Sequence, residues 1–158
     1  MKKKVIPADD SVDLRRGIDH IGVGVCAIVH DGKGSILLMK RGPRARDEQG
    51  RWDICGGAIE FGESFDEAIE RELAEELCTK PHKVEFLKVY DAHRQHGDSP
   101  THWVQILHAV QVDPATVQIG EPHKIDEIGW FNKDNLPEPL HSQFWRCYQI
   151  AIDRGIAK

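Results

Sequence analysis

Long apolar stretches predict the strands at the centre of this protein. Residues 21–30, IGVGVCAIVH, are β-branched and almost continuously apolar, as expected of a central strand that is covered on both faces. The turn signal Asp-Gly-Lys-Gly at 31–34 separates them from a second predicted strand at 35–40. The two strands are therefore expected to form a hairpin.

Three more segments have strand character. Residues 83–96 and 101–112 flank a Gly-Asp-Ser-Pro turn at 97–100 and are expected to pair antiparallel. Residues 125–131, IDEIGWF, follow a loop and predict a further strand.

Helical spacing of apolar residues appears twice. Ser64 and Glu67 form an S-x-x-E capping box, which predicts a helix that begins near Phe65. Its apolar stripe is Phe65, Ile69, Leu73 and Leu77. A second helix is predicted over 140–153. Mixed strands and helices predict an α+β fold.

Composition narrows the class of protein. The chain has 158 residues, which suits one domain, predicted over 18–158 after an N-terminal arm at 1–17. The net charge of −5 argues against a nucleic acid polymer as partner, because phosphate backbones need a basic face. The chain carries neither an apolar run of membrane-spanning length nor a secretory signal at its start, so no membrane partner is expected. The four cysteines show no C-x-x-C pair, which favours free thiols and a cytoplasmic location.

Three carboxylates carry the candidate chemistry. At about 100° per residue, Glu72, Glu75 and Glu76 lie on one side of the first helix. Crowded carboxylates repel one another, and a hard divalent cation such as Mg²⁺ or Mn²⁺ relieves that repulsion. The alternative is a solvated acidic helix face in which Arg71 is a local ion-pair partner.

The segment 57–79, GAIEFGESFDEAIERELAEELCT, resembles the Nudix box, the signature of the Nudix hydrolase family. The positions that match in register are Gly57, Glu63, Arg71, Glu72, Leu73, Glu75 and Glu76. At average residue frequencies, the six invariant ones would match by chance at a given site roughly once in ten million. Cys78 and Thr79 depart from the pattern, which has Gly and an aliphatic residue there. Because Cys tolerates a left-handed cap poorly, the helix is expected to end differently.

The resemblance implies the Nudix fold, an α/β/α sandwich around a mixed sheet. It also implies Mg²⁺-dependent hydrolysis of a diphosphate linkage in a nucleoside diphosphate derivative, which is a small-molecule nucleotide substrate. The compact length and the Glu-Pro-His-Lys loop at 121–124 favour a nucleoside triphosphate. ADP-ribose, dinucleoside polyphosphates and other nucleotide sugars are alternatives.

The resemblance also implies roles for individual residues. Glu72, Glu75 and Glu76 would bind the metal, together with backbone of Gly56 or Gly57, and one of the glutamates or Glu121 would be the general base. Arg71 would orient a neighbouring glutamate, and Glu63 would support the site. Arg41, at the end of the second strand, would face the substrate phosphates.

Other candidates are weaker. Trp103 is a candidate for stacking on a nucleobase, although a strand Trp is more often core. The strand histidines are His93, His96, His102 and His108. Their spacing favours local hydrogen bonds over a metal or base-recognition cluster. The sequence leaves a homodimer open.

Two other functions use the same fold. A non-catalytic module would bind a nucleotide and signal, but such modules usually have degenerate boxes, whereas this one keeps its charged positions. An isomerase acting on isoprenoid diphosphates would need a catalytic Cys, for which Cys55 is the candidate.

Overall fold

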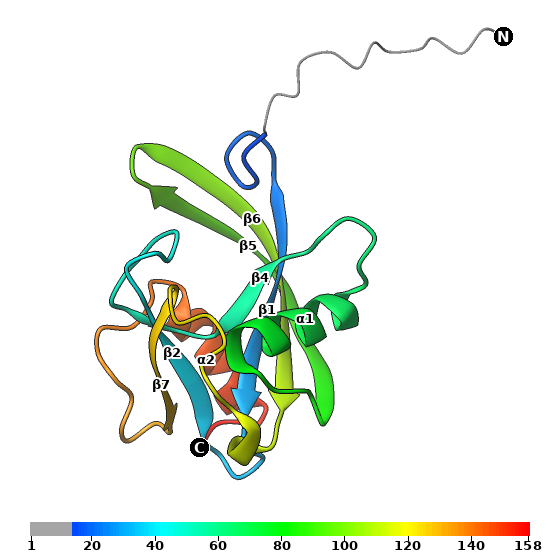
Figure 1. Ribbon diagram of the computed structural model, residues 1–158, viewed down its shortest axis with the longest axis vertical. Helices are drawn as coiled ribbons and strands as arrows, with labels where there is room; N and C mark the ends of the chain where they lie inside the picture. The colour runs from blue at the N-terminus through cyan, green and yellow to red at the C-terminus, as the bar shows by residue number, and fades with distance from the viewer. Residues whose placement is uncertain (1–13) are drawn as a thin grey trace, which may run out of the picture.

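A computed structural model describes residues 14–158 as a mixed β-sheet with one helix on each face (Figure 1). The predicted arm at 1–17 therefore lies largely outside the described residues. The strands are β1 Gly22–His30, β2 Ile36–Arg41, β3 Trp52–Asp53, β4 Cys55–Ala58, β5 Lys83–His96, β6 Ser99–Gln111 and β7 Ile125–Phe131. The helices are α1 Phe65–Leu77, α2 Phe144–Asp153 and the short 3₁₀ turn Pro114–Thr116.

Strand β1 is central, as its apolar run predicts. The sheet order is β3-β2-β1-β6-β5, with β4 pairing β1 and β7 pairing β2. The β1–β6 pair is parallel and runs from Gly22–Trp103 to His30–Gln111, while the other pairs are antiparallel. The sheet is therefore mixed.

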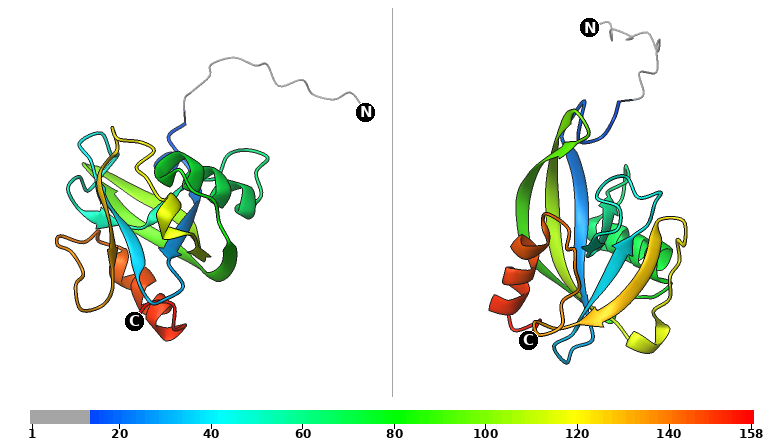
Figure 2. Two further views of the ribbon diagram at one scale, coloured as in Figure 1. Left: turned by 60° about the horizontal axis from the view of Figure 1, so that its bottom comes forward. Right: turned by 90° about the vertical axis from the view of Figure 1, so that its left-hand side faces the viewer.

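Successive residues of β1 and β2 point to opposite helices, which explains the continuous apolar run. One core packs Val25 and Leu37 against α1, and the other packs Ile28 and Leu38 against α2. All four side chains are at most 2% exposed. The two helices thus cover the two faces of the sheet, as Figure 2 shows.

The predicted hairpin of β1 and β2 holds only at its closed end. The two strands pair at His30 and Ile36 and then diverge. Beyond that point β4 becomes the antiparallel neighbour of β1, from Ala27–Cys55 to Gly24–Ala58. Strand β2 turns instead to β7 along its whole length. The wedge between β1 and β2 opens onto a cavity whose lining includes Arg41, Asp47 and Asp53.

Strands β5 and β6 form the predicted antiparallel hairpin, which extends beyond both helices (Figure 1). Its register pairs Arg94 with Thr101 and Ala92 with Trp103. The hairpin thereby places Arg94 and Trp103 beside the wedge between β1 and β2.

Helix α1 begins as predicted. The Glu67 N–H donates to Ser64 Oγ and the Ser64 N–H donates to the Glu67 carboxylate, which completes the capping box. Ile69, Leu73 and Leu77 are fully buried. Phe65 does not join them, because it lies in the first turn and is 51% exposed.

The prediction that Cys78 changes the helix end is wrong. Cys78 adopts the left-handed conformation, with φ 53° and ψ 26°, that a glycine normally occupies. Two backbone N–H groups, of Gln118 and Gly120, donate to the carbonyls of Leu77 and Glu76. These bonds offset the cost of about 1–2 kcal/mol for a left-handed non-glycine residue.

Helix α2 begins later than predicted, at Phe144 instead of Leu140. Residues 140–143 form a turn that is anchored to strand β3, where the His141 N–H donates to the Trp52 carbonyl. No helix within 14–158 is both long and apolar enough to cross a membrane.

Candidate functional site

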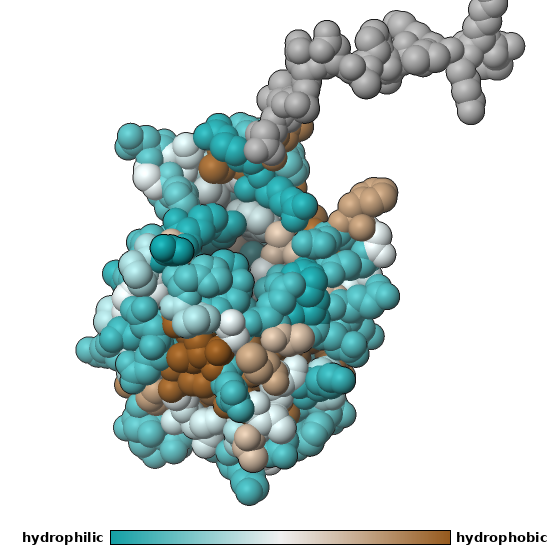
Figure 3. All heavy atoms as spheres, in the orientation of Figure 1, coloured by the Kyte–Doolittle hydropathy of each residue, from teal (hydrophilic) through white to brown (hydrophobic). Residues whose placement is uncertain are grey.

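A cleft of about 450 Å³ lies between α1, β4 and the loop at 42–50. Charged side chains of α1 form one wall, β4 backbone forms the floor, and cationic side chains form the rim. The α1 residues are Arg71, Glu72, Glu75 and Glu76, and the cationic ones are Arg16, Arg41, Arg44, Arg46 and Lys124. Figure 3 shows that the face drawn in Figure 1 is predominantly hydrophilic.

Two glycines bring the floor of the cleft against the helix. Gly56 and Gly57 lie in strand β4 and pair with Cys26 and Val25 of β1. A Cβ at Gly57 would overlap the Glu72 carboxylate. Gly56 has φ +153°, and a Cβ there would overlap the Val25 carbonyl oxygen. Only glycine allows backbone this close to the carboxylates.

Glu72 and Glu76 face this backbone. Glu72 is 8% exposed, and burial is the main reason that its pKa is raised. The Gly56 N–H donates to Glu76 Oε2 at 3.2 Å. Burial, with smaller contributions from Glu72 and Glu121, raises the pKa of Glu76 to about 8. Glu75 is more open, with half of its side chain exposed.

Arg71 links the helix to the loop before it. Its Nε donates to Glu63 Oε1 at 2.6 Å and its Nη2 to Glu63 Oε2 at 3.0 Å. Its Nη1 donates to Glu72 Oε1 at 2.7 Å and lies 3.4 Å from Glu75 Oε2. The Arg71 guanidinium therefore contacts three of the carboxylates of the box.

The donors in the cleft suit a hard cation, although they are not yet gathered around one point. Within 14–158, no three His, Cys, Asp or Glu side chains already stand at metal-binding spacing. Glu76 has no ion-pair partner among the described side chains, and burial of its carboxyl is the main reason that its pKa is raised. Carboxylate oxygens in a half-buried cleft are the ligands that Mg²⁺ prefers.

Glu121 lies at the edge of this group. Its carboxylate accepts from Lys124 Nζ at 2.8 and 2.9 Å. Its charge is among those that raise the pKa values of Glu72 and Glu76. Lys124 itself lines the cleft, so the loop brings a cation as well as a carboxylate to the site.

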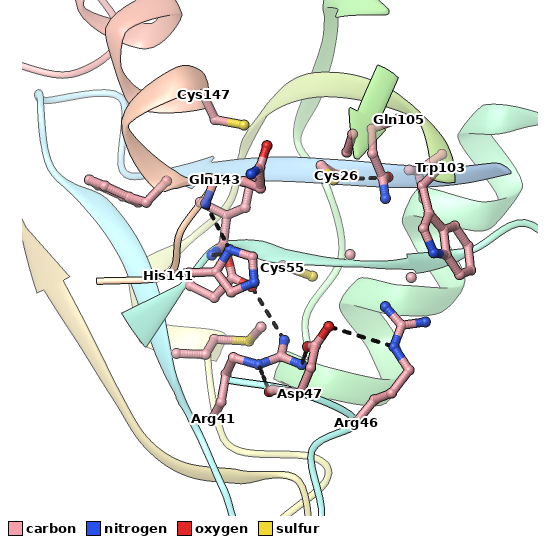
Figure 4. Close-up of a pocket in the computed structure, with 18 of the residues that line it drawn as sticks. Cys26, Arg41, Arg46, Asp47, Cys55, Trp103, Gln105, His141, Gln143 and Cys147 are labelled. Carbon is pink, nitrogen blue, oxygen red and sulfur yellow. Dashed lines mark hydrogen bonds and ion pairs between the residues drawn. The ribbon is translucent and has the colours of Figure 1, made fainter. Parts of the chain in front are cut away.

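Arg41 lies in the wall that the cleft shares with an inner cavity of about 130 Å³, shown in Figure 4. Its Nε donates to the Asp47 carbonyl and its Nη2 to Asp47 Oδ1. Its Nη1 donates to Asp53 Oδ2 at 3.3 Å. Every guanidinium nitrogen of Arg41 thus has a protein partner, although the side chain still lines the cleft.

Trp103 lines the same cavity from β6 and is 4% exposed. The Arg46 guanidinium lies over its ring, 4.9 Å from the ring centroid. Trp103 also borders a side pocket of about 390 Å³ that adjoins the cleft.

The strand histidines do not gather at the carboxylates. His93 and His102 stack across β5 and β6 with ring centroids 4.1 Å apart. His108 is buried, and its Nδ1 lies 3.2 Å from the Ile106 carbonyl oxygen. His96 borders the side pocket.

Sequence reasoning missed a half-buried charge cluster beside the inner cavity. Asp47 contacts Arg41 and Arg94, and His141 contacts both Arg94 and Glu48. These residues come from four separate segments of the chain. The sequence shows that these residues are charged or titratable, but no pattern in it indicates that the four segments meet.

Comparison with known proteins places these features in context. Residues 20–149 match the NUDIX domain family. An ADP-ribose pyrophosphatase from Methanocaldococcus jannaschii is 30% identical over 136 residues, which cover 86% of this chain and 76% of that protein. An isopentenyl-diphosphate Delta-isomerase from Halobacterium salinarum is 29% identical over 167 residues, which cover 95% of this chain and 77% of that protein. The crystal structure of a MutT NUDIX hydrolase from Burkholderia pseudomallei matches with a TM-score of 0.73 at 30% identity, covering 82% of this chain and 97% of that one.

Proposed function

The chain belongs to the Nudix family and is a hydrolase of pyrophosphate bonds, and from that premise we propose that it cleaves the diphosphate linkage of a nucleotide with the help of Mg²⁺. The observation that carries the proposal is the placement of Glu72 and Glu76. Their carboxylates meet the β4 backbone, and cationic side chains line other parts of the same cleft. An anionic diphosphate fits into this cleft only if cations neutralise the carboxylates.

Glu72, Glu75 and Glu76 would hold the metal, with backbone of Gly56 or Gly57 contributing from the floor. A divalent cation bound there supplies charge neutralisation at the phosphate oxygens and a more acidic water. Arg71 keeps Glu72 in place through its bond to Oε1 and is itself held by Glu63.

Proton transfer falls to a carboxylate of this cleft. One of Glu72, Glu75, Glu76 or Glu121 takes the proton from the attacking water. Arg41 and Lys124, two residues of the cationic rim, would hold the phosphate oxygens by charge-assisted hydrogen bonds.

We propose a nucleoside triphosphate as the substrate class. The Glu-Pro-His-Lys loop and the short chain favour it, and the cleft is of a size typical for small-molecule sites. ADP-ribose is the second candidate, because the related archaeal protein is an ADP-ribose pyrophosphatase. In either case Trp103, on the wall of the inner cavity, would lie near the nucleoside.

A substrate panel tests the proposal. Nucleoside triphosphates, ADP-ribose, a nucleotide sugar and isopentenyl diphosphate are each incubated with the protein and Mg²⁺, and products are separated by chromatography. Cleavage of a diphosphate bond in any nucleotide supports the proposal. Nucleotide binding without cleavage would identify a sensor module, and isomerisation of isopentenyl diphosphate would identify an isomerase.

Cys55 argues against the isomerase. Its thiol is 2% exposed, and burial together with Glu76 raises its pKa well above the usual range. A buried, protonated thiol is a poor nucleophile or base.

A further inference from the structure

Arg46 lies where three hollows meet. It lines the carboxylate cleft, the inner cavity and the side pocket, and Ala58 is the other residue common to all three. A ligand that extends from the carboxylates toward the side pocket passes Arg16, Arg46 and Ala58, the residues that border both the cleft and the side pocket.

Three guanidiniums surround Asp47, and they differ in how many of their nitrogens contact protein acceptors. Arg41 donates from all three of its nitrogens to Asp47 and Asp53. Arg94 contacts Asp47, Glu48 and His141 and is 13% exposed. Arg46 is 53% exposed, and its ion-pair contact, from Nε to Asp47 Oδ2, is long at 3.9 Å. Among the described residues, the Nη groups of Arg46 have no hydrogen-bond acceptor.

Trp103 is the surface on which Arg46 rests. The guanidinium lies over the indole, and the close approach of Gly17 and Gly22 covers other parts of the same ring, because a Cβ at either would overlap it. Little of the indole is left for a nucleobase. The contact instead places the Arg46 guanidinium over the indole, 4.9 Å from the ring centroid, where a cation is attracted to the aromatic face. Figure 4 shows Arg46 next to Trp103, with its Nε directed at Asp47.

We propose that Arg46 is a substrate-binding residue that donates to a diphosphate oxygen at the junction of the cleft and the side pocket. Trp103 and Asp47 are its positioning residues. The organic end of the substrate then occupies the side pocket, whose lining includes Ile18 and Thr101. This assignment rests on the proposed function and shifts the main phosphate contact from Arg41 to Arg46.

Binding and kinetics test the assignment separately. Calorimetry with Mg²⁺ and α,β-methylene-ADP, which resists cleavage, measures binding by wild type, Arg46→Ala, Arg46→Lys and Arg44→Ala. A lost charge-assisted hydrogen bond weakens binding by about tenfold to a hundredfold. Arg46→Ala is expected to show that loss. Arg46→Lys recovers only part of it, because Lys lacks the planar fork that stacks on Trp103.

Arg44→Ala is the matched control, since it removes the same charge from the same loop. Arg44 is exposed and lines the cleft, but it borders neither the inner cavity nor the side pocket. Arg44 therefore makes no hydrogen bond at their junction in this proposal, and its loss should weaken binding through long-range attraction by about threefold or less. With the best substrate of the panel, Arg46→Ala should raise KM by the same factor as Kd and change kcat less.

Three results would overturn the assignment: Arg46→Ala binds as tightly as wild type, Arg44→Ala loses as much as Arg46→Ala, or wild type does not bind the analogue. A wild type that binds the analogue but cleaves no nucleotide contradicts the proposed function instead. The ratio of Arg46→Ala to wild-type binding then still decides the role of Arg46.

Discussion

Arg71 donates two parallel hydrogen bonds to Glu63, from Nε to Oε1 at 2.6 Å and from Nη2 to Oε2 at 3.0 Å. The same guanidinium donates to Glu72 Oε1 at 2.7 Å. Glu63 therefore supports the site indirectly: it holds Arg71 in place, and Arg71 holds Glu72, a proposed metal ligand.

Replacing Glu63 by Gln should lower kcat by roughly tenfold, because Arg71 loses the fork that aligns it with Glu72. Glu70→Gln is the control, since Glu70 is an exposed carboxylate of the same helix. Steady-state kinetics distinguish the two. Equal rates for both variants would show that Arg71 needs no support from Glu63.

The Glu63 pair also gives a pH signature. The bonds from Arg71 lower the pKa of Glu63 to about 2. Its stabilising effect is thus complete above the unfolded pKa near 4.5 and is lost as pH falls toward 2. The difference in melting temperature between wild type and Glu63→Gln should shrink over that range. A difference that stays constant would contradict the assignment.

For Glu76, we expect stability to depend on pH in the opposite direction. Its pKa in the metal-free fold is raised to about 8, so the free energy of unfolding should fall as pH rises from about 4.5 to 8. Mg²⁺ should restore it, by about 2.7 kcal/mol at a hundredfold excess over Kd. The shift in melting temperature caused by Mg²⁺ should be larger at pH 8 than at pH 5, and Glu76→Gln should abolish most of it. Equal shifts at both pH values would argue against metal binding at Glu76.

Gly57→Ala should inactivate the protein and destabilise it by about 1–3 kcal/mol, because the new methyl group overlaps the Glu72 carboxylate. The double variant Gly57→Ala with Glu72→Ala removes the overlap. It should recover most of the stability in urea denaturation while staying inactive. If the double variant is as unstable as Gly57→Ala, the glycine serves another purpose.

Cys78→Gly should stabilise the fold by about 1 kcal/mol, since glycine adopts φ +53° without the steric cost of a Cβ. Cys78→Ala keeps the Cβ and should bring no gain. Urea denaturation compares the two. A loss of stability in Cys78→Gly would mean that the sulfur makes a contact worth more than the strain.

Features that depend on neighbouring residues in the sequence were predicted correctly. The capping box at Ser64 placed the start of α1, and the 3.6-residue period placed Glu72 and Glu76 together. The apolar run at 21–30 predicted a strand buried on both faces, because two helices divide its side chains.

Features that depend on distant segments were not predictable. The glycines of β4 lack strand propensity and pair only because β1 offers an open edge. The contact of Arg46 with Trp103 joins a loop and a strand that are 57 positions apart in the sequence. The carbonyls of Glu76 and Leu77, beside the left-handed cap at Cys78, accept from Gly120 and Gln118, which belong to a loop far along the chain.

The most direct test of the account is the Mg²⁺-dependent cleavage rate of Glu76→Gln against the best nucleotide of the panel. Since Gln keeps the shape but removes the charge, the account predicts an intact fold by circular dichroism and a kcat/KM lower by about 10³-fold or more. Turnover near that of wild type would contradict the central claim that this carboxylate belongs to the catalytic metal site.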